Sequence, residues 1–172
     1  MPILEAVFDQ ERIQAEIKRV AGEISSDYKG RELALVGVLK GAFIFLADLV
    51  RNLTIPAYVD FVRVSSYGDG TQPSGNIRLS QDVTLDLDGK DVLLVEDIVD
   101  TGHTMAFLLS HFSGRNAASV ACCALVDKTG RRSRGVDLKY SCLSVAGGFL
   151  VGCGLDYAEK HRGLPGIYSL KP

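Results

Sequence analysis

The chain has 172 residues, of which 47% are hydrophobic and 23% charged, as in an ordinary soluble globular protein. A chain of this length is expected to form one compact domain that buries roughly 70% of its unfolded surface. The formal net charge of −2 argues against nucleic acid as a bulk partner, because that role requires a strong positive field. An anionic ligand must therefore be held by local donors and a metal ion.

Helical and strand patterns alternate along the first half of the chain. Apolar residues at helical spacing predict a helix over 13–21, and an apolar run predicts a buried strand over 33–39. A second helix is expected over 43–53 and a second strand over 57–64. The polar segment 65–75 holds three glycines and a proline, and long polar loops in compact domains often act as lids.

The same alternation continues in the second half. We expect a strand pair over 77–87 and then a strand over 92–95, whose unbroken apolar run predicts burial on both faces. A helix follows at about 105–112, and a further strand spans 119–126. Strands that alternate with helices predict an α/β fold.

The domain organisation follows from these elements. We expect a single domain over 1–172, with its core at about 30–130. The less regular tail predicts a small hood, built from the N-terminal segment and about 136–172.

The N-terminus has no signal-peptide pattern, and the longest later uncharged stretch, 141–155, is shorter than the ~20 residues that span a bilayer. We therefore expect a cytoplasmic protein with no membrane contact.

The four cysteines lack Cys-x-x-Cys spacing, so reduced, buried thiols are expected and a zinc site is not.

Segment 90–105 carries the strongest chemical signal. Its apolar strand is followed by Glu96 and Asp97, by a third acid at Asp100, and by Thr-Gly-His-Thr at 101–104. Ligands of open α/β sheets bind at the carboxyl ends of the strands, and successive backbone N–H groups at a helix start form an anion site. A capped connection with solvated acids would explain the Thr-Gly turn alone, but not the whole pattern.

Acids beside an anion site would repel an anionic ligand unless something bridges or neutralises them. A sugar diol can donate two hydroxyls to carboxylates, and Mg²⁺ shared with a pyrophosphate supplies positive charge. The pattern therefore favours a ligand that has a phosphate, a ribose diol and a Mg²⁺-bound pyrophosphate.

The sequence Val-Leu-Leu-Val-Glu-Asp-Ile-Val-Asp-Thr-Gly-His-Thr at 92–104 resembles the signature of the type I phosphoribosyltransferases, whose donor is 5-phosphoribosyl 1-pyrophosphate. Other blocks resemble the hypoxanthine-guanine branch of that family, and they follow in the family's order. They are Leu-Val-Gly-Val-Leu-Lys-Gly-Ala-Phe at 35–43, Val-Asp-Phe-Val-Arg-Val-Ser-Ser-Tyr-Gly-Asp at 59–69, Leu-Val-Asp-Lys at 125–128, and the glycine-rich segment 148–165.

The resemblance implies a type I phosphoribosyltransferase fold, with a central, mainly parallel twisted sheet flanked by helices and a small hood from the chain ends. It implies purine salvage by Mg²⁺-dependent transfer of the 5-phosphoribosyl group to N9 of hypoxanthine or guanine, giving IMP or GMP plus pyrophosphate. The expected partners are the donor and a 6-oxopurine base, without nucleic acid. The family usually forms homo-oligomers, so a homodimer or homotetramer is expected.

The resemblance also implies roles within the signature. Asp100 would be the general acid or base facing N7 of the purine. Glu96 and Asp97 would take the ribose hydroxyls and help to place Mg²⁺, for which Asp156 is expected as the ligand at a second site. The residues expected to hold the 5′-phosphate are Thr101, Gly102, His103 and Thr104.

Residues outside the signature match the family's pyrophosphate site and its lid. Pyrophosphate would be met by the loop of Lys40 and Gly41, which often contains a cis peptide in the family, and by Arg162. Arg132 is a further candidate for this contact, with Arg131 and Arg134 as the alternatives. The lid would include Ser66 and Tyr67.

The base pocket is implied by three further positions. Lys128 would donate to the purine O6, Phe149 would stack on the base, and the main chain of Leu150 and Asp156 would meet the other edge of the base. The chain has Ala146-Gly147-Gly148 where the family commonly has Pro-Asp-Lys, so xanthine stays open as a substrate. Lys128 disfavours adenine, whose 6-amino group is itself a donor.

Two alternatives stay open. A nucleotide-sensing regulator could keep the phosphoribosyl site and bind nucleic acid, although this chain is net acidic and keeps Asp100 and Lys128. A pyrimidine-using relative is disfavoured by Lys128 and Phe149.

Overall fold

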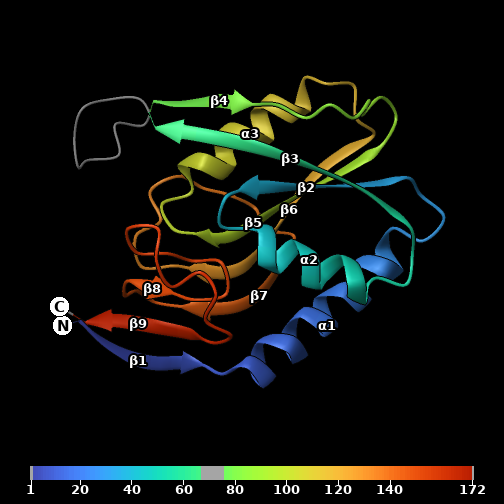
Figure 1. Cartoon of the computed structure of the whole chain (residues 1–172). Helices are drawn as coiled ribbons and strands as arrows, with labels where there is room; N and C mark the ends of the chain where they lie inside the picture. Colours follow the sequence, from blue (N-terminus) through green and yellow to red (C-terminus); the bar gives the residue numbers. More distant parts are fainter. Residues whose placement is uncertain (1, 67–75, 172) are drawn as a thin grey trace.

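The computed structural model describes residues 2–66 and 76–171 and places a six-stranded sheet at the centre of the fold (Figure 1). The strand order is β4-β3-β2-β5-β6-β7. All neighbouring strands are parallel except β3 and β4, which are antiparallel. The strands are β2 (Leu33–Leu39), β3 (Ala57–Ser66), β4 (Ile77–Gln81), β5 (Asp91–Val99), β6 (Ser119–Lys128) and β7 (Tyr140–Val145).

Helices cover both faces of this sheet. One face carries α1 (Gln10–Asp27) and α2 (Phe43–Asn52), and the other carries α3 (His103–Ser113) (Figure 1). α1 begins at Asp9, whose Oδ1 accepts a hydrogen bond of 2.8 Å from the Arg12 backbone N–H. This cap satisfies one of the donors that a helix start leaves unpaired.

Alternate residues of the central strands enter opposite layers of the core, as strand geometry requires. On β2, Leu33 and Leu35 pack with α1 and α2, whereas Ala34 and Val36 pack with α3. Because both faces of the sheet are buried, the strand carries an unbroken apolar run rather than an alternating pattern. The expected strands and helices over 33–39, 43–53, 57–64, 92–95, 105–112 and 119–126 are confirmed.

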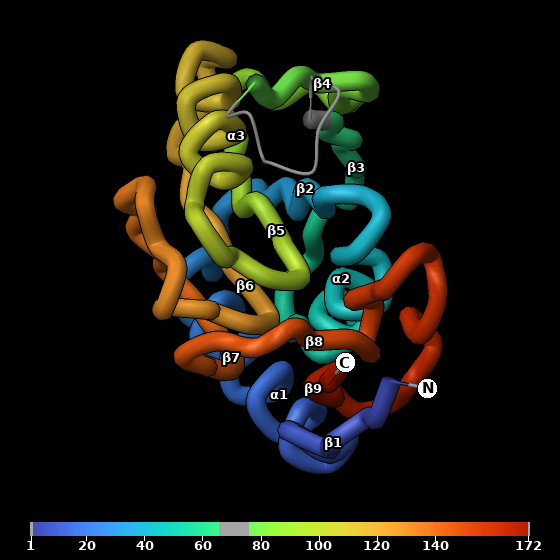
Figure 2. Tube along the Cα trace, turned by 90° about the vertical axis from the view of Figure 1, so that its left-hand side faces the viewer, coloured from blue at the N-terminus to red at the C-terminus, as the bar shows by residue number. Residues whose placement is uncertain are grey.

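A second, three-stranded sheet forms from the two ends of the chain. Its order is β1-β9-β8, with β1 (Ile3–Phe8), β8 (Leu150–Val151) and β9 (Ile167–Lys171). These strands lie at the end of the molecule opposite β4 (Figures 1 and 2). Within the segment expected to form the hood, β7 belongs to the central sheet, and β8 and β9 pair with each other.

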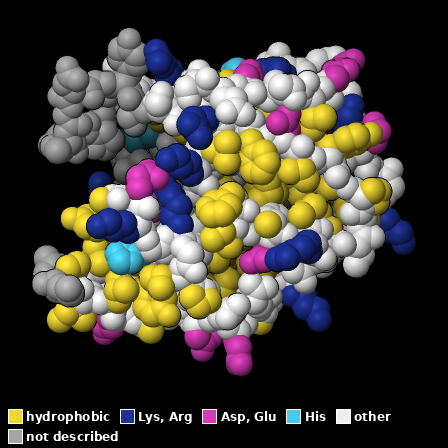
Figure 3. All heavy atoms as spheres, viewed as in Figure 1, with side chains coloured by type: hydrophobic (Ala, Val, Ile, Leu, Met, Phe, Trp, Pro, Cys, Tyr) yellow, Lys and Arg dark blue, Asp and Glu magenta, His cyan; other side chains and the backbone are white. Residues whose placement is uncertain are grey.

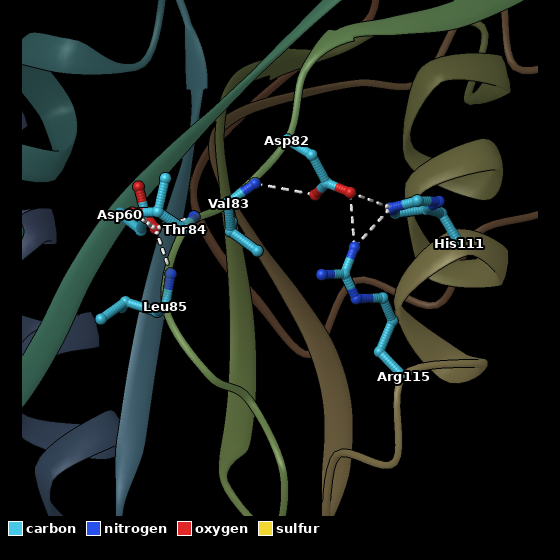
Figure 4. Close-up of polar contacts among 7 residues, drawn as sticks. All are labelled: Asp60, Asp82, Val83, Thr84, Leu85, His111 and Arg115. Atoms are coloured by element: carbon cyan, nitrogen blue, oxygen red, sulfur yellow. Dashed lines mark hydrogen bonds and ion pairs between the residues drawn. The ribbon is translucent and has the colours of Figure 1, made fainter.

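The expected strand pair over 77–87 is wrong. Only β4 forms there, and residues 82–90 run as a connection whose Val83 and Leu87 enter the core. Oδ2 of Asp60, on β3, accepts the backbone N–H groups of Thr84 and Leu85 at 2.8 and 3.0 Å (Figure 4). The carboxylate thus satisfies donors that a second strand would have used in a ladder.

Asp82 fixes the start of the same connection to α3. Its Oδ2 lies 3.1 Å from Nε2 of His111 and also accepts from the Arg115 guanidinium, while Oδ1 accepts the Val83 N–H at 2.7 Å (Figure 4).

Two further expectations concern composition. All four cysteines are buried and free, as expected. None of the helices in the described ranges is long and apolar enough to cross a membrane.

Candidate functional site

The candidate site lies where the parallel strands end. Glu96 and Asp97 lie near the end of β5, Lys128 is the last residue of β6, and Lys40 directly follows β2. The carboxyl ends of parallel strands meet at one edge of a sheet, which is the usual ligand-binding position in open α/β folds. The hood faces this edge through β8 and the turns that follow it.

Of the two consecutive acids, Glu96 is buried and Asp97 is half-buried. Glu96 is 7% exposed, and burial together with the neighbouring charge of Asp97 raises its pKa well above the ordinary value. Burial also raises the pKa of Asp97, although Arg162 partly offsets this. The backbone gives little compensation, with one N–H at 3.1 Å to Glu96 Oε1 and one at 2.7 Å to Asp97 Oδ1. Both carboxylates therefore favour a ligand that brings hydroxyl donors or positive charge.

Gly41 allows the loop after β2 to approach this acid pair. A Cβ at Gly41 would lie 1.8 Å from Oδ2 of Asp97, so no larger residue fits without a shift. The peptide bond between Leu39 and Lys40 is cis, the geometry that the family resemblance implied for this loop. The Gly41 carbonyl in turn lies against Gly154 of the hood segment.

A small cavity of about 110 Å³ lies at the start of α3, lined by Thr101, Gly102 and Thr104 of the loop and by Glu96 and Asp100. Gly102 has φ +92°, a conformation that favours glycine, and a Cβ there would lie 2.4 Å from the Arg134 carbonyl oxygen. The Thr101 carbonyl accepts the Ser133 and Arg134 N–H groups, both at 3.0 Å. The backbone of Ser133 and Arg134 thus holds the loop in place. The N–H groups of the loop itself, at the start of α3, suit an anion.

The imidazole of His103 also contacts the protein behind the loop, because its Nε2 lies 3.0 Å from Ser133 Oγ.

Asp100 holds an unusual position among the site carboxylates. Its Oδ2 lies 3.3 Å from Nζ of Lys128 and 3.6 Å from the Arg131 guanidinium. Its Oδ1 is buried and has no hydrogen-bond partner among the described residues. A buried carboxylate oxygen without a donor is costly, which marks it as an acceptor for a ligand.

A second cavity of about 250 Å³ opens beside Asp100. Lys128, Phe149 and Leu150 line it, together with Asp97 and Asp156. Lys128 is 7% exposed, whereas Phe149 is 50% exposed and meets the Tyr157 ring edge-on at 5.6 Å between centroids. A buried ammonium and an exposed aromatic face suit a flat base that carries a carbonyl group.

Arg132 is engaged within the protein. Its Nε donates to the Asp100 carbonyl at 3.0 Å, and its terminal nitrogen pairs with Asp127 and lies 3.3 Å from the Val99 carbonyl. The side chain thereby ties the end of β5 to β6. Arg131, one of the two arginines left open as alternatives, is 61% exposed at its side chain and lies nearer the base cavity.

The remaining cations lie beside acidic hood residues. Arg162 contacts Asp156 Oδ1 at 3.1 Å and Glu159 at 3.4 Å, and it donates to the Gly154 carbonyl at 2.7 Å. Lys40 pairs with the same Glu159 at 2.9 Å.

The two residues expected in the lid are Ser66 and Tyr67. Tyr67 lies outside the described residues, and only the backbone of Ser66, at the end of β3, is described.

The carboxylates of the site suit a metal ion that is shared with a ligand. No group of three or more His, Cys, Asp or Glu side chains in the described ranges is arranged to hold a metal by itself. Mg²⁺ usually needs only one or two carboxylates together with substrate phosphates and water. Glu96 and Asp97 fit that requirement, because their oxygens lack cationic neutralisation of their own beyond Arg162.

Sequence reasoning missed two side chains at this site, Glu159 and Tyr157. Both lie in the family-like segment 148–165, but the sequence analysis assigned a role to neither, and only the fold brings them against Phe149 and Lys40.

Comparison with known proteins identifies the family to which this fold belongs. A family model described as the phosphoribosyl transferase domain matches residues 4–158, and the chain belongs to this family. Among its relatives, the hypoxanthine-guanine phosphoribosyltransferase of Streptococcus thermophilus (strain CNRZ 1066) is 41% identical over 98% of this chain and 94% of its own length. The bifunctional protein TilS/HprT of Listeria innocua is 39% identical over 99% of this chain, which spans only 26% of that relative.

Solved structures agree with this assignment. A hypoxanthine phosphoribosyltransferase from Staphylococcus aureus superposes with a TM-score of 0.94 and 36% identity, covering 98% of this chain and 91% of that one. A hypoxanthine-guanine phosphoribosyltransferase from Bacillus anthracis gives a TM-score of 0.92 and 36% identity over 99% of both chains. The fold is therefore that of the type I phosphoribosyltransferases, as the sequence predicted.

Proposed function

We propose that the chain transfers the 5-phosphoribosyl group from 5-phosphoribosyl 1-pyrophosphate to N9 of hypoxanthine or guanine, giving IMP or GMP and pyrophosphate in purine salvage. The observation on which this rests is the pairing of Asp100 with Lys128 at the mouth of the base cavity. Lys128 can donate to a 6-oxo group, and the unpartnered Oδ1 of Asp100 can accept a ring N–H. An adenine base would place its amino donor against the ammonium.

The donor molecule is assigned to the acid pair and the adjoining loop. The loop 101–104 binds the 5′-phosphate through backbone N–H and threonine hydroxyl groups. Glu96 and Asp97 accept the ribose hydroxyls. Mg²⁺, when bound with the donor, supplies positive charge to the leaving pyrophosphate and is held by Glu96, Asp97 and, at a second site, Asp156.

In the reaction the bond from the ribose C1 to N9 forms while the bond from C1 to the pyrophosphate oxygen breaks, and the electron pair leaves with pyrophosphate. Cationic character develops on the sugar, and the nearby carboxylates favour it. Asp100 takes the ring proton at N7, a contribution of typically ~10²–10⁴ in rate. Lys40, Gly41 and Arg162 receive the pyrophosphate, and closure by Ser66 and Tyr67 keeps water away. Arg132 supports the loop through its hydrogen bonds to the Val99 and Asp100 carbonyls, and Arg131 is assigned to a ligand because it lines the base cavity.

The test is nucleotide formation with Mg²⁺ and 5-phosphoribosyl 1-pyrophosphate, run in parallel with hypoxanthine, guanine, xanthine, adenine and uracil. We expect turnover of hypoxanthine or guanine, none of adenine or uracil, and no turnover after chelation of the metal. Turnover of xanthine would assign a wider preference to the pocket beside Gly147 and Gly148. Binding of the donor without turnover of any base would support a regulator instead.

We further propose that the protein is cytoplasmic. We also propose that it forms a homodimer or homotetramer, and sedimentation can measure this oligomeric state.

A further inference from the structure

Glu159 connects two cations of the proposed pyrophosphate site. Its Oε2 lies 2.9 Å from Nζ of Lys40, which follows β2, and its Oε1 lies 3.4 Å from the Arg162 guanidinium. Lys and Arg side chains gather near the carboxyl end of β2, with an acidic side chain among them (Figure 3). One carboxylate therefore stands between the two groups that the proposed function assigns to an anionic product.

The backbone around Glu159 is a strained tight turn. Tyr157 and Lys160 exchange N–H···O=C hydrogen bonds of 3.0 and 2.9 Å, and the two residues between them, Ala158 and Glu159, have φ +50° and +65°. Positive φ at both central residues is typical of a type I′ turn, which strongly prefers Asn-Gly. Neither residue here is glycine or asparagine, so the turn carries a cost of the kind that often marks functional positions.

Other contacts fix the direction of the turn. The Glu159 N–H donates to Asp156 Oδ2 at 2.8 Å, and the Arg162 guanidinium donates to the Gly154 carbonyl. Gly154 packs closely against Gly41, because a Cβ added at Gly154 would lie only 2.1 Å from the carbonyl oxygen of Gly41. The turn is thus held against the loop that carries Lys40.

The ion pairs themselves are weak. The side chains of Lys40 and Glu159 are 51% and 64% exposed, and exposed pairs contribute little because water screens them. Arg162 also pairs with Asp156 at 3.1 Å, so Glu159 is the second carboxylate at that guanidinium. A ligand with several negative charges can therefore displace Glu159 from Lys40 and from Arg162.

We propose that Glu159 is an internal competitor of pyrophosphate, which neutralises Lys40 and Arg162 in the empty site and is displaced when the pyrophosphate group binds. This inference rests on the proposed function. Glu159 is a positioning residue, since it acts through the two cations. Its effect is to weaken the binding of pyrophosphate and so to favour release of that product.

The test compares Glu159→Gln and Glu159→Gly with the wild type. Glutamine removes the charge and keeps the shape, and glycine also suits the positive φ, so at least one variant folds normally. Glu23→Gln is the control, because Glu23 forms an exposed pair with Arg19 on α1, outside the site. Calorimetry gives the dissociation constant of inorganic pyrophosphate with Mg²⁺ at low and high salt, and steady-state kinetics give the KM of each substrate.

We expect both Glu159 variants to bind pyrophosphate roughly two- to fivefold more tightly at low salt, the size of effect of an exposed ion pair. The difference should shrink at about 1 M salt, where screening acts over about 3 Å. The KM for 5-phosphoribosyl 1-pyrophosphate should fall, while that for hypoxanthine and all constants of Glu23→Gln stay unchanged. Unchanged or weaker pyrophosphate binding in both variants, with a wild type that turns over, overturns the inference alone. A wild type that neither binds pyrophosphate nor forms nucleotide overturns the proposed function as well.

Discussion

Acidic side chains in two parts of the central sheet, at β3 and β4 and at β5, have opposite surroundings. Asp60 on β3 and Asp82 after β4 accept several hydrogen bonds each, from backbone N–H groups and, for Asp82, from Arg115 (Figure 4). Glu96 and Asp97 on β5 are more deeply buried and receive one backbone N–H each.

The pKa shifts record this contrast. Burial opposes ionisation of Asp60, but hydrogen bonds from the N–H groups of Leu85, Phe61 and Thr84 outweigh it and lower the pKa. At Glu96, burial and the Asp97 charge both raise the pKa. Carboxylates that hold the fold together are therefore satisfied by the protein, whereas those of the site are left for a ligand to satisfy.

The largest expected effect is at Asp100, whose Oδ1 has no partner. Asp100→Asn keeps the shape of the side chain but cannot accept a proton, so kcat/KM for hypoxanthine should fall by about 10²–10⁴. Steady-state assays measure this change, with Asp86→Asn as an exposed control of the same chemistry. A rate within threefold of the wild type would show that Asp100 is not the proton acceptor.

At Asp60 we expect a smaller effect, which falls on the stability of the fold and not on the activity. In Asp60→Asn the amide nitrogen cannot accept, so at least one backbone N–H loses its partner, at a cost of about 1–2 kcal/mol in the free energy of unfolding. Denaturant melts measure this cost, and kcat should stay unchanged.

The pH dependence of the Asp60 effect has a definite sign. Because the folded-state pKa is lowered, the stability from the ionised carboxylate is present above the unfolded value near ~3.9 and is lost as pH falls through the folded pKa. The gap between wild type and Asp60→Asn should therefore close in acid. A gap that widened in acid would contradict this assignment.

The smallest expected effect is a gain in stability, at Glu96. Glu96→Gln removes an ionisable group that burial and the charge of Asp97 make costly to ionise, so at neutral pH the unliganded variant should be about 1 kcal/mol more stable than the wild type, while its activity falls. Because the folded-state pKa of Glu96 is raised, the wild type suffers this penalty only as pH rises above the unfolded value near ~4.3. Thermal melts at several pH values should show the gain vanishing below that pH. A variant less stable than the wild type at neutral pH would refute the contrast drawn above.

Much of this arrangement could be predicted from the sequence. The apolar run before Glu96 and the helical spacing after Thr104 identify β5 and α3 because burial on both faces leaves few polar residues. The family resemblance then supplied Asp100, Lys128 and the fold.

Other parts could not be predicted, for physical reasons. The alternating pattern over 77–87 suits two strands, but the side chain of Asp60 captures the N–H groups of the second half, and such a capture leaves no local signal. The engagement of Arg132 with carbonyls of β5 and the pairing of Glu159 with Lys40 depend on residues far apart in the chain. Tertiary contacts of this kind are decided by the whole fold.

The pairing of β1 with β9 affects how the protein is made. Among the strands that the structure describes, β1 pairs with β9 alone, and its residues 3–8 meet 167–171. During synthesis the central sheet can assemble while β1 is still unpaired. A contact between segments so far apart in the sequence forms slowly. Phe149 and Asp156 lie between β1 and β9 in the chain, so the wall that they give to the cavity beside Asp100 is completed only after β9 has been synthesised.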